Sequence, residues 1–298
     1  MMSSILLPPY YVIEPTDICN FRCSICPHSQ EWNNTQHGIM DLSLFKRIVS
    51  QIADSACVIQ LYWMGEPLLN PNIIEMIAFC KQTTKAKVII STNGSLLSHS
   101  IVTKLVDSGL DELIISVDAC DKQEIYSQIR IGGNLAQLNS NIEYLLSNKG
   151  DLHVVLQFID MYLNKTEKEP FLRKWGGKQC DIDISCLYSW SNQLPWLNSL
   201  SDNLSPVRNK QRIPCADLWK KMVIHWNGDI SICCFDFENK IFLGNCKETS
   251  LVDIWNNEII SKQRIDQREG VYDERLCRYC DSWAEPFEYE EMYHIEKR

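Results

Sequence analysis

Short apolar runs alternate with longer amphipathic stretches along the first two thirds of the chain. The short runs are rich in β-branched residues, and two of them, KVIIST and LIISVD, are almost continuously apolar. Continuous apolar character is typical of strands that are buried on both faces of a parallel sheet. The pattern predicts six strands, at residues 10–13, 58–62, 88–91, 112–117, 153–159 and 181–187.

The stretches between these strands carry recognisable helix ends. Asn70 is a predicted N-cap followed by Pro71 at the first helical position, an arrangement that favours helix initiation. A second helix is predicted to begin at Ser98 and to stop at Gly109, and a third to stop at Gly150. Glycine is favoured after the last turn of a helix because it accepts a left-handed backbone.

Six βα units therefore fit between residue 10 and about residue 187. A complete eight-unit barrel needs about 250 residues, so the predicted fold is α/β, a partial (βα)6 TIM-like barrel. Such sheets place their chemistry at the carboxyl ends of the strands. The predicted divisions are a barrel at 1–187, a polar linker or active-site loop at 188–214, and a small β-hairpin/helix domain with a tail at 215–298.

Composition narrows the class of protein. The net charge of −9 and the dispersed basic residues argue against a nucleic-acid partner. No run of about 18 apolar residues predicts a membrane span, and the first residues, MMSSILLPPYYV, do not resemble a signal peptide. Fourteen cysteines without an export signal predict a reducing cytoplasm, where thiols serve metals or chemistry rather than disulfides.

Three of these cysteines follow the first predicted strand in the run CNFRCSIC, as Cys19, Cys23 and Cys26. The C-x3-C-x2-C spacing places three sulfurs on one tight loop, and soft thiolates select zinc or iron–sulfur clusters. Zinc would need a fourth ligand, for which His28 lies nearby. A [4Fe–4S] cluster would instead keep one iron free for an outside ligand. Spacing alone leaves both options open, together with three buried thiols that bind no metal.

Four further cysteines form a second set in the last third of the chain. KMVIHWNGDISICC reads as a β-hairpin with a cysteine near its end, and CRYC is a short knuckle that offers two thiolates. A structural zinc site is one reading of this set. Its members are Cys215, Cys233, Cys277 and Cys280.

The first set, in its position after the first strand, resembles the radical S-adenosylmethionine (SAM) superfamily. Three further segments match that family in the expected order. MGEP at 64–67 resembles the family's GGEP segment, with Met64 in place of the first glycine. STNG at 91–94 resembles its ribose-contacting segment, and ISVD at 115–118 ends the fourth strand. The resemblance implies that Cys19, Cys23 and Cys26 hold a [4Fe–4S] cluster whose open iron chelates SAM. The SAM contacts that it implies are Ile25, Gly65, Glu66, Ser91, Asn93, Ser116 and Arg130.

The second set resembles the SPASM/twitch extension of the same superfamily, through PCADLW, the spacing from Gly228 to Cys233, and LGNCKETSLVDIW. Full SPASM extensions carry more cysteines, so the resemblance implies the twitch form, with one fully ligated auxiliary [4Fe–4S] cluster. Most remaining cysteines are expected to be small buried hydrophobes. Three near the predicted site are candidate hydrogen-atom donors, Cys234, Cys120 and Cys186.

The resemblance implies an oxidoreductase in which a 5′-deoxyadenosyl radical removes hydrogen from a C–H bond and the auxiliary cluster takes or relays an electron. It points to dehydrogenation or epimerisation of a carbohydrate-like small molecule, a sugar, aminocyclitol or nucleoside, with an external reductant of the flavodoxin or ferredoxin type. The predicted first strand starts near residue 10, which leaves little room for an N-terminal peptide-recognition domain. A peptide-modifying enzyme and a zinc-only binding protein are the alternatives.

Overall fold

A computed structural model describes residues 7–29, 37–201, 212–280 and 283 of the chain. Its centre is a nine-stranded sheet with the order β6-β5-β4-β3-β2-β1-β7-β8-β9. The first six strands are parallel and lie in sequence order, which is the topology of a partial barrel. They are β1 (Tyr10–Ile13), β2 (Val58–Gln60), β3 (Lys87–Thr92), β4 (Glu112–Ser116), β5 (His153–Ile159) and β6 (Asp181–Ser185).

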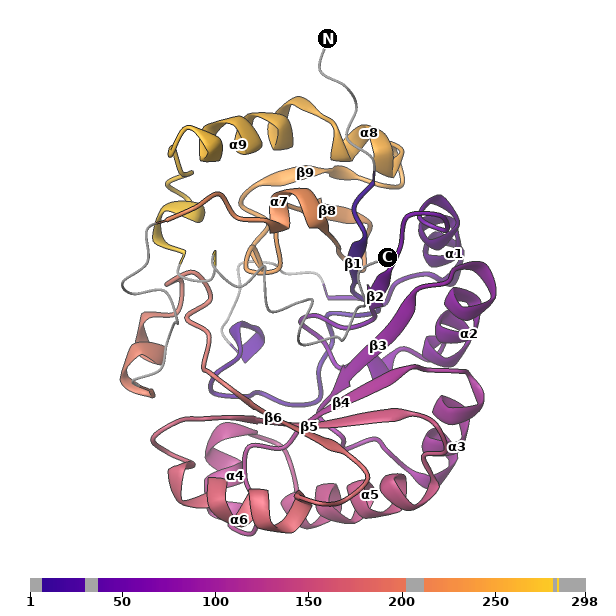
Figure 1. Cartoon of the computed structure of the whole chain (residues 1–298), viewed down its shortest axis with the longest axis vertical. Coiled ribbons are helices and arrows are strands. Elements are labelled where there is room, and N and C mark those ends of the chain that lie inside the picture. Colours follow the sequence, from indigo (N-terminus) through magenta and orange to yellow (C-terminus); the bar gives the residue numbers. More distant parts are fainter. Residues whose placement is uncertain (1–6, 30–36, 202–211, 281–282, 284–298) are drawn as a thin grey trace.

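Helices cover the outer face of these strands, as Figure 1 shows, and leave the opposite face turned toward the middle of the molecule. This arrangement confirms the predicted α/β class and the partial (βα)6 barrel. All six predicted strands are present, with ends shifted by at most two residues. The helices are α1 (Leu42–Gln51), α2 (Ile73–Thr83), α3 (His99–Asp107), α4 (Gln123–Ile129), α5 (Leu135–Asn148) and α6 (Lys165–Trp175).

Three of the four predicted helix ends are confirmed and one is wrong. The Ser98 side chain accepts from the amide of Ile101, and Gly109 and Gly150 follow the C-caps of α3 and α5 with φ of +78° and +54°. Asn70, however, does not cap a helix. Pro67 begins a short 3-10 helix, η2 (Pro67–Leu69), which ends at Asn70, and α2 starts only at Ile73. The proline therefore nucleates a separate turn, which displaces the expected start of α2.

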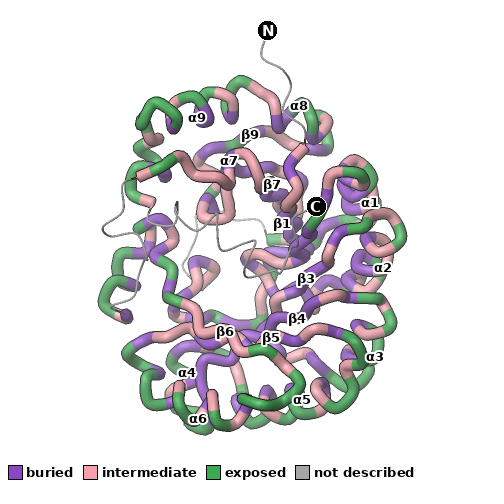
Figure 2. Tube along the Cα trace, viewed as in Figure 1, coloured by how far each residue is buried: buried purple, intermediate pink, exposed green. Residues whose placement is uncertain are grey.

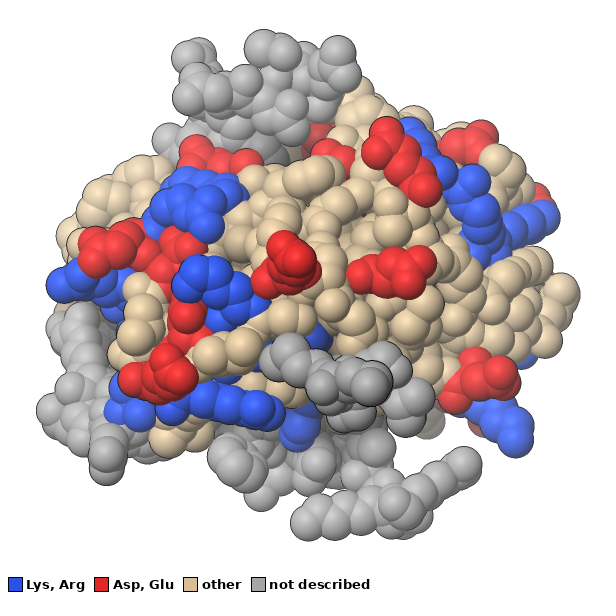
Figure 3. Space-filling view, turned by 90° about the horizontal axis from the view of Figure 1, so that it is seen from above, with Lys and Arg blue, Asp and Glu red and all other residues tan. Residues whose placement is uncertain are grey.

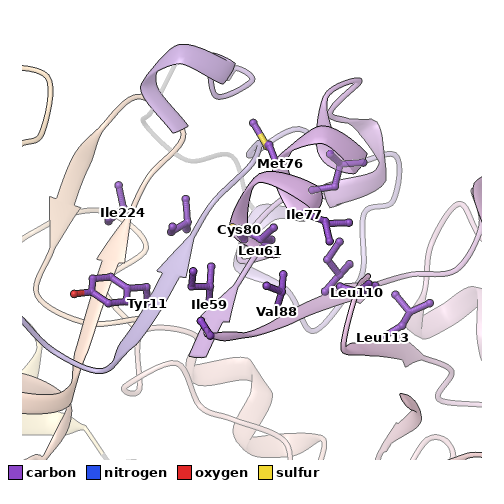
Figure 4. Packing of buried hydrophobic residues seen from close by; sticks show 14 of the residues in the cluster. Tyr11, Ile59, Leu61, Met76, Ile77, Cys80, Val88, Leu110, Leu113 and Ile224 are labelled. Atoms are coloured by element: carbon purple, nitrogen blue, oxygen red, sulfur yellow. The ribbon is translucent and has the colours of Figure 1, made fainter. Parts of the chain in front are cut away.

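The hydrophobic core lies between the sheet and the helices. Figure 4 shows Ile59 and Val88 of the sheet packed against Met76, Ile77 and Cys80 of α2. All five side chains are at most 3% exposed. In Figure 2 the strands are largely buried, while the helices are exposed on their outer sides. Burial of this layer fixes which residues of each strand face outward, because side chains alternate along a strand.

The alternate residues face the inside of the barrel in three levels. At the amino ends of the strands, Glu112 accepts from Lys87 and His153 at 2.8 Å each. An apolar level follows, with Val58, Ile89 and Ile114. Toward the carboxyl ends the inner face turns polar, which creates a lined mouth. The polar level consists of Gln60, Ser91, Ser116 and Gln157.

The C-terminal part does not form a separate layer, because its first strand continues the barrel sheet. β7 (Lys221–Ile224) pairs in parallel with β1, and β8 (Asp229–Ser231) and β9 (Phe242–Asn245) follow antiparallel. The sequence predicted the hairpin but not its attachment to β1. The C-terminal part also contains α7 (Asp217–Lys220), α8 (Leu251–Trp255), α9 (Glu258–Arg268) and the short 3-10 helix η4 (Cys277–Tyr279). Two other short 3-10 helices lie elsewhere in the chain, η1 (Pro27–Ser29) between β1 and α1 and η3 (Pro195–Ser199) after β6.

The surface carries charges of both signs. On the face in Figure 3, Lys and Arg side chains lie among Asp and Glu side chains rather than in a field of one sign. Among the described helices, none combines the length and the apolar character that crossing a bilayer requires.

Candidate active site

The loop from β1 to α1 carries the first three cysteines into one buried cluster. Its backbone is fixed by hydrogen bonds from the amides of Arg22 and Ser24 to the carbonyls of Ile131 and Ile129 at the end of α4, at 2.9 and 3.0 Å. Cys23 is 7% exposed, and Cys19 and Cys26 pack against the same apolar cluster. Ile25, the predicted adenine contact, belongs to this cluster too.

Burial governs the charge of these thiols. Burial, with smaller contributions from the nearby Cys23 and Cys19, raises the pKa of Cys26 to about 12. Burial likewise raises the pKa of Cys19 to about 11. A neutral buried thiol becomes a thiolate when a cation coordinates it, so three mutually interacting thiols in an apolar wall fit a thiolate-bound cluster. Among the described residues, no three His, Cys, Asp or Glu side chains have the spacing for a single metal ion.

The MGEP segment folds directly onto this loop. A Cβ on Gly65 would lie 2.2 Å from the carbonyl oxygen of Thr16, so only glycine allows the approach. The neighbouring Glu66 is 2% exposed, and burial raises the pKa of its carboxyl group. That carboxylate accepts from Thr92 Oγ1 at 2.7 Å and from the amide of Asn93 at 2.8 Å. Glu66 therefore joins the loops after β2 and β3, besides its predicted contact with SAM.

The STNG segment is held by hydrogen bonds within the mouth. Asn93 donates to Asn20 Oδ1 at 2.9 Å, and Asn20 lies in the cysteine loop. Ser91 and Ser116 face the inside of the barrel on neighbouring strands, as the register of β3 and β4 requires. The structure thus brings the predicted SAM contacts of β2, β3 and β4 to one edge of the sheet.

Arg130, the predicted partner of the SAM carboxylate, already pairs with a buried residue. Its Nε lies 2.6 Å from Oδ2 of Asp118, which is fully buried and has a φ of +58°. Its Nη1 points at Cys23 Sγ, 3.8 Å away. Asp118 also accepts from the amide of Ile159 at 2.7 Å. The pair fixes a guanidinium beside the cysteine loop, where free N–H groups can meet an anionic ligand.

The second set of cysteines lines one cavity between α7, the hairpin and η4. Apolar side chains line much of this cavity, among them Leu218, Ile232 and Leu276. Burial, with a smaller contribution from the neighbouring Cys280, raises the pKa of Cys277 to about 12. Four thiols around one cavity fit a fully ligated cluster. The cavity contains all four predicted ligands, Cys215, Cys233, Cys277 and Cys280.

The three candidate hydrogen donors lie in different places. Cys120 is 1% exposed and packs in the core between sheet and helices, away from the mouth. Cys186 is exposed, just after β6. Cys234 lies beside Cys233, and its carbonyl accepts from Trp63 Nε1 at 2.9 Å. Cys234 thus adjoins the second set and accepts, through its carbonyl, from Trp63, which packs against the cluster that contains Cys23.

Sequence reasoning missed Glu14, at the end of β1, and Trp63, after β2. Glu14 is 1% exposed on the inner side of the mouth, and Trp63 packs against the cluster that contains Cys23. The available signal was strand alternation: Tyr11 and Ile13 face the helices, so Glu14 continues the inward-facing row. A buried acidic residue at the end of an otherwise apolar inner row is a candidate functional residue.

Comparison with known families agrees with this geometry. The profile of the radical SAM superfamily matches residues 13–172, more than half of the chain, and that of an iron–sulfur cluster-binding domain, SPASM, matches residues 215–281. The chain belongs to the radical SAM superfamily and carries a SPASM domain. It is a SAM-dependent oxidoreductase, and its cofactors are [4Fe–4S] clusters and SAM.

Two curated proteins are similar over most of their length. The S-adenosyl-L-methionine-dependent 2-deoxy-scyllo-inosamine dehydrogenase of Niallia circulans is 24% identical, over 91% of this chain and 91% of its own. The tungsten-containing aldehyde ferredoxin oxidoreductase cofactor-modifying protein of Pyrococcus furiosus (strain ATCC 43587 / DSM 3638 / JCM 8422 / Vc1) is 25% identical, over 88% of this chain and 85% of its own.

Solved structures share the fold. BtrN in complex with AdoMet and 2-DOIA superposes with a TM-score of 0.60 at 21% identity, covering 89% of this chain and 88% of BtrN. SuiB of Streptococcus suis, bound to the precursor peptide SuiA, gives a TM-score of 0.69 at 17% identity, covering 98% of this chain and 74% of SuiB. At these identities the likeness concerns the fold.

Proposed function

We propose that this protein oxidises or epimerises a carbohydrate-like small molecule by removing a hydrogen atom from one of its C–H bonds. When bound, SAM and the first cluster supply a 5′-deoxyadenosyl radical for this step, and the auxiliary cluster takes or relays an electron. Cys19, Cys23 and Cys26 are the proposed ligands of the first cluster, and the four cysteines of the C-terminal cavity those of one auxiliary cluster, as in the twitch form.

One observation carries the proposal. Trp63 packs in the apolar cluster that contains Cys23, and its indole donates to the carbonyl of Cys234, next to the second set. The Trp63 indole therefore links the surroundings of the two thiol sets. In this proposal a ligand bound at the mouth lies between the two sets. That arrangement suits a reaction in which a hydrogen atom leaves toward one site and an electron toward the other.

The substrate class rests on the similarity to the Niallia circulans dehydrogenase, which spans nearly the whole of both chains. The proposed SAM contacts are Gly65, Glu66 and Arg130, with Ile25, Ser91, Asn93 and Ser116. In this proposal Arg130, oriented by Asp118, binds the SAM carboxylate through its remaining N–H groups. The polar serines of β3 and β4 meet the ribose and carboxylate, and the apolar walls exclude water from the radical.

Further parts of the proposal concern partners and place of action. An external one-electron donor of the flavodoxin or ferredoxin type reduces the first cluster, and no nucleic acid takes part. Thiolate-bound clusters survive in reducing surroundings, which supports action in the cytoplasm.

The test is to reconstitute the protein anaerobically and incubate it with SAM, a reductant and a panel of sugars, aminocyclitols and nucleosides. We expect 5′-deoxyadenosine to form, with deuterium transferred from one labelled carbon and a carbonyl or epimeric product. A precursor peptide serves as the parallel substrate.

Modification of the peptide and none of the small molecules would show that the protein is instead a peptide-modifying enzyme. Material that holds zinc and no iron after reconstitution would contradict radical chemistry altogether.

A further inference from the structure

The inner row of β1 ends in a buried acid that faces a histidine of the C-terminal hairpin. The amide of Glu14 donates to the carbonyl of Ile224 at 2.9 Å, which extends the β1–β7 ladder by one residue. Its carboxylate accepts from the amide of Trp226 at 3.1 Å. His225 Nδ1 lies 4.0 Å from the Glu14 carboxylate. The join between the two parts of the chain thus places Glu14 and His225 together.

The imidazole of His225 has spare hydrogen-bonding capacity. Its Nε2 is shielded from bulk solvent and has no hydrogen-bond partner among the described residues. The ring is held edge-on against Trp63, with ring centroids 4.6 Å apart. Buried polar atoms are normally paired, so an unpaired nitrogen held in one orientation indicates that a ligand supplies the missing partner.

Both residues line a cavity of about 580 Å³. Trp63, Trp226 and Phe237 contribute aromatic walls to it. Trp226 is held in place because it lies against Gly38, where a Cβ would approach its ring to 2.2 Å. Small-molecule sites have this size and this mixture of apolar walls with a few polar groups. The volume is sufficient for a sugar or cyclitol ring.

The charges around the cavity favour a cationic ligand. Lys240 lies 2.8 Å from the Glu238 carboxylate, so this cation is already paired. Asp229 receives amide hydrogens from Asn227 and Asn245, neither of which is charged. Among the described lining residues, four acidic side chains stand against this one lysine, namely Glu14, Asp17, Asp229 and Glu238. Asp17 also lies 2.9 Å from His37 Nδ1, and burial raises the pKa of Glu14 to about 8, so the charge of Glu14 develops when a cation binds beside it. A protonated amine would gain from these acids and from the aromatic faces.

We propose that this cavity is the substrate site and selects a small polyol that carries a protonated amino group, an amino sugar or aminocyclitol. Glu14 accepts a hydrogen bond from the ligand, His225 Nε2 pairs with one of its hydroxyl groups, and the aromatic walls hold its ring. The inference rests on the proposed function and narrows its substrate class. The site lies on the β1–β7 side of the mouth, opposite the proposed SAM contacts of β3 and β4.

The experiment measures binding by calorimetry on the anaerobically reconstituted holoenzyme with SAM present. The probes are glucosamine and 2-deoxystreptamine, compared with their neutral counterparts glucose and myo-inositol. We expect each amino probe to bind at least about tenfold more tightly than its counterpart, as a charge-assisted hydrogen bond provides. Equal affinity within both pairs would overturn the proposal.

Variants locate the site. Glu14→Gln keeps one acceptor oxygen for the amides of Trp226 and Met64, both of which Glu14 accepts from, but removes the acid, and should weaken amino-probe binding by about tenfold. His225→Gln tests the second contact. The matched controls are Glu75→Gln, at an exposed ion pair with Lys46, and His153→Gln, a histidine on the inner face at the opposite end of the strands. Controls that weaken binding as much as the site variants would contradict the assignment.

Two further outcomes separate this inference from the proposed function. If the reconstituted protein holds iron and cleaves SAM but shows no preference for amino probes, only the inference fails. If it does not cleave SAM, the proposed function fails while probe binding still reports on the cavity. A loss of probe binding when SAM is added would assign the cavity to SAM and overturn the inference.

Discussion

The two sets of cysteines reach similar burial by opposite routes. The first set lies on one loop that follows β1, and its three members are close together in the sequence, namely Cys19, Cys23 and Cys26. The second set is assembled from three distant segments around α7, β8 and η4. The first has three thiols, and a charged side chain, Arg130, contacts one of them. The second has four thiols around one cavity. A three-thiol site leaves room for a ligand on the metal, while a four-thiol site is complete.

The largest expected difference between the two sets appears when one thiol is removed from the first set. Cys23→Ala should abolish SAM cleavage, because the open-iron cluster loses one of its three ligands, while the second cluster remains. We expect the variant to keep roughly half of the iron. Iron analysis and 5′-deoxyadenosine formation measure the two effects.

The exposed Cys57 provides the control, since Cys57→Ala should keep both iron and activity. A Cys23→Ala protein that still cleaves SAM would show that the first set does not hold the reactive cluster.

The second largest effect is expected from Cys277→Ala, in the cavity of the second set. SAM cleavage should continue, because the first set is intact, but product formation should fall by about tenfold to a hundredfold as the electron loses its acceptor. The ratio of 5′-deoxyadenosine to product is the measurement. An unchanged ratio would mean that the second cluster has only a structural role.

The different routes also explain what the sequence could predict. The members of the first set are close together in the sequence, so their spacing and the strand before them could be predicted from the sequence. The MGEP segment with Gly65 could be recognised in the same way. Strand alternation could also have revealed Glu14. The pairing of β7 with β1 could not be predicted, because it joins residues about 210 positions apart through packing alone. The place of His225 beside Glu14 depends on that pairing. The predicted N-cap at Asn70 was wrong for a local reason, because Pro67 starts a separate 3-10 turn that ends at Asn70.

A third prediction concerns Arg130, the charged side chain that contacts a thiol of the first set. Arg130→Met leaves Asp118 buried without its cation, which should destabilise the protein by about 3–5 kcal/mol and weaken SAM binding. Anaerobic denaturation and SAM titration measure these effects.

The double variant Arg130→Met with Asp118→Asn removes the buried charge, and asparagine tolerates the left-handed backbone at this position. It should regain most of the stability but not the SAM affinity. Recovery of both would show that Arg130 serves only to neutralise Asp118.

The smallest effect is expected at the candidate hydrogen donors, where the structure separates Cys120 from Cys234. Cys120 packs in the helix-facing core, so Cys120→Ala should cost about 1 kcal/mol of stability and leave product formation unchanged. Cys234 adjoins the second set and is bonded to Trp63, so Cys234→Ala should alter the product or its stereochemistry if a thiol returns hydrogen to the substrate radical. Solvent deuterium in the product measures that step. Loss of the deuterium in the Cys120 variant but not in the Cys234 variant would contradict this prediction. It would mean that the mouth reaches into the helix-facing core and that Cys120, which belongs to neither set of cysteines, takes part in the reaction.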